Sequence, residues 1–103
     1  MYKFSFFVPI EYADVVKQAV FNAGAGCIGD YAECSWETLG TGQFKPLEGS
    51  DPFIGKHKKL QRVQELKVEM VCQESAIKNV IKVFKQIHPY EEPAYEVLKL
   101  ECF

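Results

Sequence analysis

The residues best suited to chemistry lie close together near the carboxyl-terminal end, in the segment His88-Pro89-Tyr90-Glu91-Glu92-Pro93-Ala94-Tyr95. This segment, the His88 corner, holds an imidazole, two carboxylates and two phenols within eight positions. Because proline fixes its own φ angle and biases the preceding residue towards extended backbone, the two prolines predict a rigid bend after a helix that ends near His88. An imidazole beside carboxylates can hold a divalent metal ion or act as an acid–base pair.

The same groups also have a structural interpretation. Neighbouring side chains of an extended segment point to opposite sides, so only one of Glu91 and Glu92 is expected to face a pocket. His88 would end the helix, where its charge complements the helix dipole, and the prolines would shape the entry into the last strand. On residue chemistry alone, this structural interpretation is favoured over a metal or ligand site.

Other candidate motifs are weaker. Gly40-Thr41-Gly42 resembles a phosphate-binding loop only superficially, because the lysine-serine end of a P-loop and the spacing of a dinucleotide fingerprint are missing. Lys56-His57-Lys58-Lys59 is a basic patch, which is interpreted as solvated loop in preference to an anion contact. The four cysteines form no C-x-x-C pair and are expected to be buried thiols. Two histidines are too few for a histidine-rich dimetal centre within one chain.

Size and composition exclude several classes of protein. With 103 residues, of which 48% are hydrophobic, the chain is expected to form one domain with a genuine core. A net charge of −2 argues against nucleic acid as the main partner. No apolar run is long enough to span a membrane, and the N-terminus is typical of a first strand and not of a signal peptide. Cytoplasmic residence is therefore expected.

Periodicity predicts strands and helices in alternation. The expected elements in chain order are a strand at 2–8, a helix at 12–23, a strand at 27–37, a strand at 66–72, a helix at 77–87 and a strand at 94–103. The interval Leu39–Gly55 is rich in glycine and proline and is expected to be a long loop. Phe44, Leu47, Phe53 and Ile54 are expected to pin this loop to the body or to another subunit.

This order predicts an α+β, ferredoxin-like βαββαβ sandwich in which the first and third strands are central and both helices cover one sheet face. The opposite face would be open in a single copy. The aromatic residues that two short helices cannot all hide are Tyr2, Phe4, Phe6, Phe7, Tyr31, Trp36 and Tyr95. We therefore expect self-association into a closed homo-oligomer through the sheet edges and the Leu39–Gly55 loop.

Motifs along nearly the whole chain resemble the YqfO-like domain, which is inserted in proteins of the NIF-three-like family (Ngg-interacting-factor type, also labelled GTP cyclohydrolase type 2 homologues). The motifs are Gly24-Ala25-Gly26, Ile28-Gly29-Asp30-Tyr31, Cys34-Ser35-Trp36, Gly40-Thr41-Gly42-Gln43-Phe44, Pro46, Gly49-Ser50, Pro52-Phe53-Ile54-Gly55 and the His88 corner. A fainter similarity links the corner and the strand order to CutA proteins and, in fold only, to PII proteins. The resemblance implies that residues 1–103 are a single, stand-alone YqfO-like domain with a PII/CutA-like fold.

The resemblance further implies a homotrimer without catalytic residues, because the family's dimetal site lies in a body outside this segment. It makes His88 and Glu91 the candidate ligands of a divalent metal ion, the only cofactor considered. The candidate ligand-binding residues are Tyr90, Glu92, Tyr95, Gly40, Gly42 and Phe44. The function expected is a non-catalytic, oligomeric binding or regulatory domain with its site near a subunit interface. A metal-dependent hydrolase or cyclohydrolase accessory and a pure protein-interaction module are the alternatives.

Overall fold

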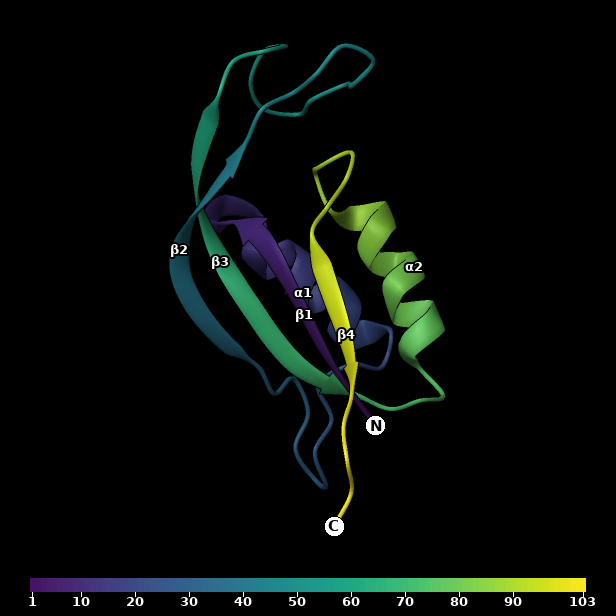
Figure 1. The fold of residues 1–103 in the computed structure, drawn as a ribbon. Helices are drawn as coiled ribbons and strands as arrows, with labels where there is room; N and C mark the ends of the chain where they lie inside the picture. Colours follow the sequence, from purple (N-terminus) through teal and green to yellow (C-terminus); the bar gives the residue numbers. More distant parts are fainter.

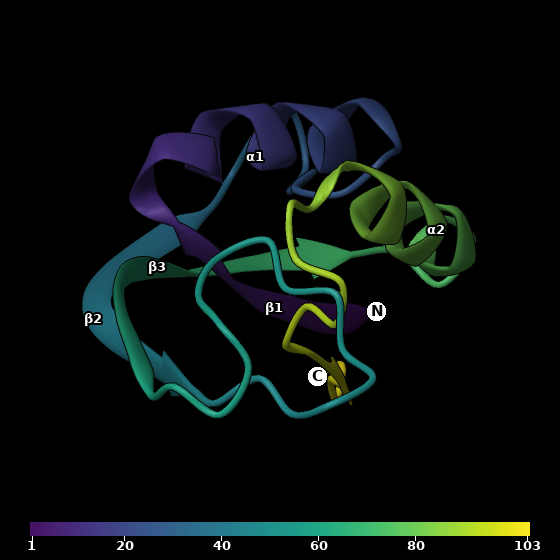
Figure 2. The same ribbon diagram turned by 90° about the horizontal axis from the view of Figure 1, so that it is seen from above.

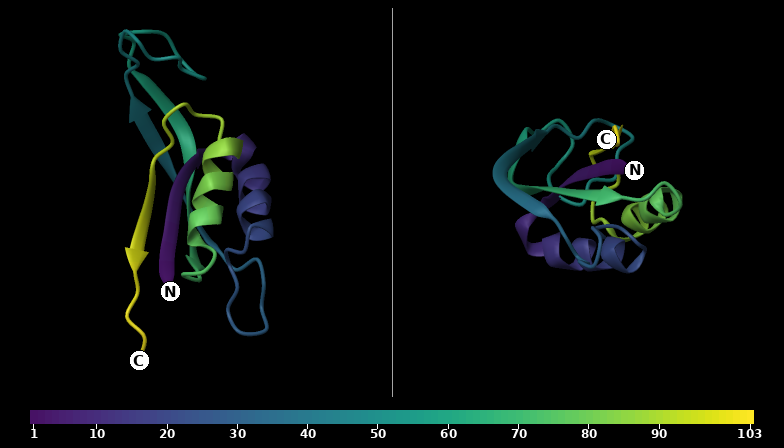
Figure 3. Two further views of the ribbon diagram at one scale, coloured as in Figure 1. Left: turned by 90° about the vertical axis from the view of Figure 1, so that its right-hand side faces the viewer. Right: turned by 90° about the horizontal axis from the view of Figure 1, so that it is seen from below.

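The computed structural model describes all residues from 1 to 103 as four strands, two α-helices and one 3-10 turn (Figure 1). The elements are β1 (Tyr2–Pro9), η1 (Ile10–Tyr12), α1 (Ala13–Asn22), β2 (Trp36–Phe44), β3 (Gln61–Cys72), α2 (Ile77–Ile87) and β4 (Tyr95–Lys99). The strands form one antiparallel sheet in the order β2-β3-β1-β4. Both helices cover the same face, as the edge-on view in Figure 3 shows. The ferredoxin-like class and the central first and third strands are confirmed.

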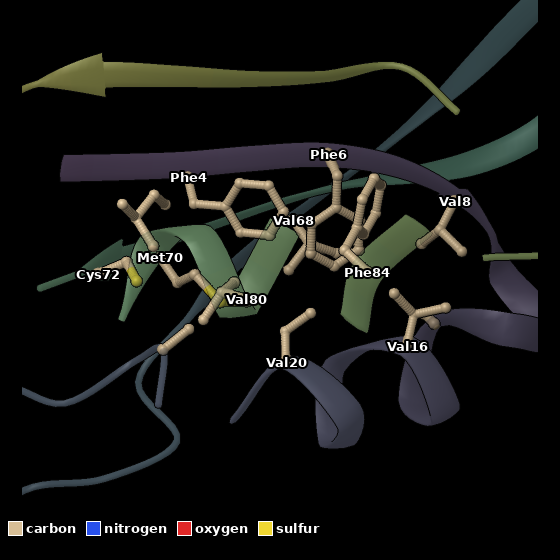
Figure 4. Packing of buried hydrophobic residues seen from close by; sticks show 13 residues of the cluster. Phe4, Phe6, Val8, Val16, Val20, Val68, Met70, Cys72, Val80 and Phe84 are labelled. Atoms are coloured by element: carbon tan, nitrogen blue, oxygen red, sulfur yellow. The ribbon is translucent and has the colours of Figure 1, made fainter. Parts of the chain in front are cut away.

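The core lies between this face and the helices (Figure 4). Alternation along β1 directs Phe4, Phe6 and Val8 inward, and each is fully buried. Phe84 of α2 packs edge-on against Phe4 with ring centroids 5.3 Å apart, and it lies 5.0 Å from the Phe6 ring. Full burial of each such side chain stabilises the fold by about 1.5–3 kcal/mol relative to leaving it exposed. This layer therefore anchors β1 and α2, the two elements that meet at the His88 corner.

The prediction for the second strand was wrong. Residues 27–35 hold only an isolated bridge between Ile28 and Tyr31, and the strand runs instead over Trp36–Phe44. The first six residues of the expected Leu39–Gly55 loop, 39–44, are therefore sheet, paired with β3 in the register that places Gly40 opposite Glu65. The alternation was invisible because β2 is an edge strand with both faces largely exposed and two glycines on one of them.

The open face of the sheet is more polar than expected. Phe4 and Phe6 lie under the helices, whereas Glu69 in the middle of the open face pairs with Lys3 at 2.7 Å and lies 4.0 Å from Lys67. Large exposed apolar side chains do occur as well, and Trp36 shares this face because it stands opposite Glu69 in the register. Tyr31 is 75% exposed and Trp36 is 70% exposed.

The remaining corrections concern details of the chain. The expectation of buried thiols holds for Cys72 alone, because Cys27 and Cys102 are exposed and Cys34 is half-buried; all four are free. The last strand ends at Lys99, and the Leu100 N–H then donates to the Met1 carbonyl at 3.0 Å, which brings the two ends of the chain together (Figure 1). None of the helices has the length and apolar character needed to cross a membrane.

Candidate ligand-binding site

A hollow of about 890 Å³ lies on the open face of the sheet, beneath the segment that joins β2 to β3. We call this segment, residues 45–60, the arch; seen from above, it lies on the side of the sheet away from the helices (Figure 2). The floor is formed by residues of three strands: Phe7, Thr38, Gly40, Gly42, Glu65, Lys67 and Glu69. The walls come from the arch and from the His88 corner, so segments distant in sequence meet around one cavity.

The arch is held in place by specific contacts. The Asp51 backbone N–H donates to Glu91 Oε1 at 2.9 Å, which ties the arch to the His88 corner. Phe53 packs edge-on against Tyr12 of η1 with ring centroids 5.4 Å apart, so the predicted pinning by Phe53 is confirmed. Within the arch, His57 Nε2 lies 2.9 Å from the Ser50 carbonyl oxygen. His57 thus helps to shape the arch.

His88 ends helix α2 and lies at the junction of three segments. The Tyr90 backbone N–H donates to His88 Nδ1 at 3.0 Å, so Nδ1 must be the acceptor nitrogen of a neutral ring. Nε2 therefore carries the hydrogen and donates it to the Phe7 carbonyl oxygen at 2.8 Å. The residue is 6% exposed, and burial lowers the pKa of His88 although the bond to Phe7 acts in the opposite direction. The geometry favours the structural interpretation of this histidine.

The His88 corner does not fit a metal ion. Both imidazole nitrogens already bond to backbone groups, and Glu91 accepts a hydrogen bond from the arch. No group of three or more histidine, cysteine, aspartate or glutamate side chains lies close enough to coordinate a metal. A metal at His88 would have to displace a backbone hydrogen bond in a buried position, which is costly. The metal role implied by the resemblance therefore has no geometric support.

Sequence reasoning missed Glu65, which is the central polar group of the hollow. Its Oε2 accepts a hydrogen bond from the Tyr90 hydroxyl at 2.7 Å, and the residue is only 8% exposed. Burial first, and then this hydrogen bond, raises the pKa of the Tyr90 phenol, so the phenol stays protonated. The Phe44 ring lies 5.8 Å from the Tyr90 ring. Glu65 could have been found only from the register of β2 against β3, which the sequence did not reveal.

Gly42 makes room for Glu65. A Cβ atom at Gly42 would lie 2.6 Å from the carboxylate carbon of Glu65 and closer still to Oε1. Gly40 has no such neighbour within 4 Å. The two glycines are therefore strand residues of the floor, and neither belongs to a phosphate-binding loop.

The structure gathers most of the predicted ligand-binding residues around the hollow and leaves two predicted site residues out. Of the predicted residues, those that line the hollow are Gly40, Gly42, Phe44, Tyr90, Glu91 and Glu92. His88 lies behind Tyr90, with ring centroids 5.0 Å apart. Tyr95 lies on the helical side of the sheet, 5.5 Å from the Phe84 ring, where Lys85 Nζ approaches its face at 5.4 Å. Whether the lining residues bind a ligand remains a prediction.

Comparison with known proteins finds relatives that are much longer than this chain. It is 46% identical over 100 residues to a protein of Halalkalibacterium halodurans and 44% identical over 99 residues to one of Bacillus subtilis, both named GTP cyclohydrolase 1 type 2 homolog. These matches cover 97% and 96% of this chain but 27% and 26% of the relatives. The chain thus spans about a quarter of their length. No protein-family model matches it.

Solved structures agree with this relationship and with the fold. A Bacillus cereus protein related to NIF3 superposes with a TM-score of 0.83 at 40% identity, over 98% of this chain and 26% of that protein. The periplasmic divalent cation tolerance protein CutA of Archaeoglobus fulgidus superposes with a TM-score of 0.69 at 17% identity, over 100% of this chain and 87% of that protein. The PII-like CutA of Nostoc superposes with a TM-score of 0.68 at 14% identity, over 98% of this chain and 82% of that protein. At such identities the CutA matches show the fold alone.

Proposed function

We propose that this chain, which corresponds to one segment of the NIF3-related (NIF-three-like) family, is a domain that binds a small ligand and performs no catalysis of its own. The observation that carries the proposal is the hollow beneath the arch. Its volume of about 890 Å³ falls within the range of about 300–1,000 Å³ typical of small-molecule sites. Apolar side chains of the arch and a few convergent polar groups surround it, which is the composition that such sites share.

The state of the polar groups supports binding over catalysis. General acid–base chemistry needs a group that exchanges protons near the working pH and reaches the substrate. His88 is buried with both nitrogens engaged, and the pKa of the Tyr90 phenol is raised away from neutrality. The Tyr90 phenol thus offers the hollow a neutral hydrogen-bonding group. Such groups suit recognition of a ligand.

We also propose that the domain assembles with copies of itself, with a trimer as the expected state, in the cytoplasm. Both sheet edges carry exposed apolar side chains, Trp36 and Leu39 on β2 and Leu98 on β4. An edge strand also offers unpaired backbone groups to a neighbour. Light scattering at micromolar concentration is expected to give three times the chain mass of 11.8 kDa, and a stable monomer would refute this part of the proposal.

The binding proposal is tested by nuclear magnetic resonance with a library of small fragments. Fragments that bind are expected to shift the amide signals of Gly40, Gly42 and Tyr90 together, because these residues line one hollow. Shifts that cluster elsewhere, or none at all, would contradict the proposal. Turnover of a nucleotide with added metal, lost on chelation, would instead favour the hydrolase alternative. Shifts induced only by a separate protein body would favour the interaction module.

A further inference from the structure

We infer that the hollow selects ligands in which a cationic nitrogen adjoins a planar or apolar body, and that Glu65 binds the nitrogen. This inference rests on the proposed ligand-binding function and names the chemical class of the ligand. It starts from a charged group in an unusual position, a carboxylate that is 8% exposed at the floor of a cavity.

One oxygen of Glu65 is free to bind. Oε2 accepts the Tyr90 hydroxyl, whereas no protein group donates a hydrogen bond to Oε1. No side-chain polar atom that is sealed from solvent lacks a partner, so Oε1 keeps some contact with solvent, and Glu65 lines the hollow. Oε1 lies against Gly42, in the space that a Cβ atom there would fill. Gly42 beneath it contributes no side chain that could push the carboxylate aside. The structure thus presents a buried hydrogen-bond acceptor to whatever enters the hollow.

The carboxylate also lacks a cation of its own. The ion pairs of the chain join Lys3 and Lys67 to Glu69, Lys17 to Glu37, and Lys58 to Glu48, and none includes Glu65. Removing a charge from water without an opposite charge is costly, and a cationic ligand group would supply the missing partner. An ammonium or amidinium group donates hydrogen bonds to a carboxylate that are stronger than neutral ones.

The charge and the shape of the remaining lining also suit a cationic ligand with a planar or apolar body. Four carboxylates, of Glu65, Glu69, Glu91 and Glu92, face the hollow against two ammonium groups, of Lys45 and Lys67. Lys67 is itself near Glu69, so the hollow disfavours phosphates and other anions. The rings of Phe44 and Tyr90 lie 5.8 Å apart and line the hollow, and the Tyr90 hydroxyl contacts the carboxylate, so these rings can pack on a planar group or face its positive charge. An organic cation fits better than a metal ion, which lacks a third donor here.

Three probes of one shape test the inference on the whole protein: benzamidine, which is cationic, benzamide, which is neutral, and benzoate, which is anionic. We expect benzamidine to bind about tenfold more tightly than either of the others, measured by titration of the Gly42 and Tyr90 amide signals. In Glu65→Gln this preference should vanish, whereas the matched control Glu96→Gln, at an exposed strand position outside the hollow, should retain it.

A second variant separates recognition from a purely structural role. Tyr90→Phe removes the phenol from Oε2 and leaves both oxygens free, so it should retain or strengthen the preference for benzamidine. Equal affinities of the three probes, tighter binding of benzoate, or a preference that survives Glu65→Gln would overturn the inference while leaving the ligand site intact. If no probe binds although library fragments map to the hollow, only the inference falls. If neither probes nor fragments bind there, the proposed function falls with it.

Discussion

Replacing Gly42 by alanine probes the arrangement around Glu65 directly. The new methyl group would overlap the carboxylate, whose carbon would lie 2.6 Å away, and the flexible end of Glu65 would move more readily than the strand. Movement of the carboxylate breaks its 2.7 Å hydrogen bond with the Tyr90 hydroxyl. Hydrogen bonds to charged groups contribute about 1.5–3 kcal/mol, and the free energy of unfolding should fall by about this amount through the broken bond, before the gain from replacing a strand glycine is added.

Gly40→Ala is the matched control for this substitution. The residue lies two positions away on the same strand and the same face, and a Cβ there meets nothing within 4 Å. Replacing a strand glycine by alanine contributes about 0.5–1 kcal/mol of stability, a gain that both variants share. The difference between them therefore isolates the contact with Glu65 and should be about 1.5–3 kcal/mol.

Urea unfolding followed by circular dichroism measures both variants. In the background of Tyr90→Phe, the penalty for Gly42→Ala should shrink, because the hydrogen bond is already absent. Equal stability of Gly42→Ala and Gly40→Ala would refute the reasoning. So would an unchanged penalty in the Tyr90→Phe background, since the cost would then arise from the backbone.

Three further predictions follow from the His88 corner and the arch. Because the folded pKa of His88 lies below the ordinary value of 6.5, the contribution of His88 to stability is complete above that pH and is lost as the pH falls towards the folded pKa. In urea unfolding across this interval, the free energy of unfolding should therefore decline more steeply with falling pH in wild type than in His88→Gln. Calorimetric titration with Zn²⁺ should give the same heats for wild type and His88→Gln, because both ring nitrogens are engaged, and a heat lost only in the variant would restore the metal site. Glu91→Ala should speed hydrogen exchange of the Asp51 amide by roughly two- to tenfold, the equivalent of about 0.5–1.5 kcal/mol, whereas Glu92→Ala should leave it unchanged.

Sequence periodicity predicted those elements that bury one face. Helix α2 was predicted with its observed bounds because Ile77, Val80 and Phe84 recur at helical spacing and all pack into the core. The first strand and residues 66–72 of the third strand followed from alternation for the same reason, whereas the beginning of β3, residues 61–65, was not predicted. Strand β2 could not be predicted, because Thr38, Gly40 and Gly42 face the hollow while the other face meets solvent, so burial imposes no pattern on it.

The candidate site could be predicted only in part. Tyr90 and Glu92 were chosen for their chemistry, and the structure places them at the hollow together with the strand residues Gly42 and Phe44. Glu65 was missed because a charged residue in an alternating strand is normally solvated. Its burial depends on Tyr90 and on the pairing of β2 with β3, which brings Gly42 against it, and these residues are distant in sequence.

A crystal structure of the protein grown with benzamidine tests the central claim most directly. The account predicts electron density beneath the arch, with an amidinium nitrogen within hydrogen-bonding distance of Glu65 Oε1 and the ring beside Phe44 and Tyr90. Density bound only outside the hollow, or a hollow filled by the protein's own side chains, would contradict it.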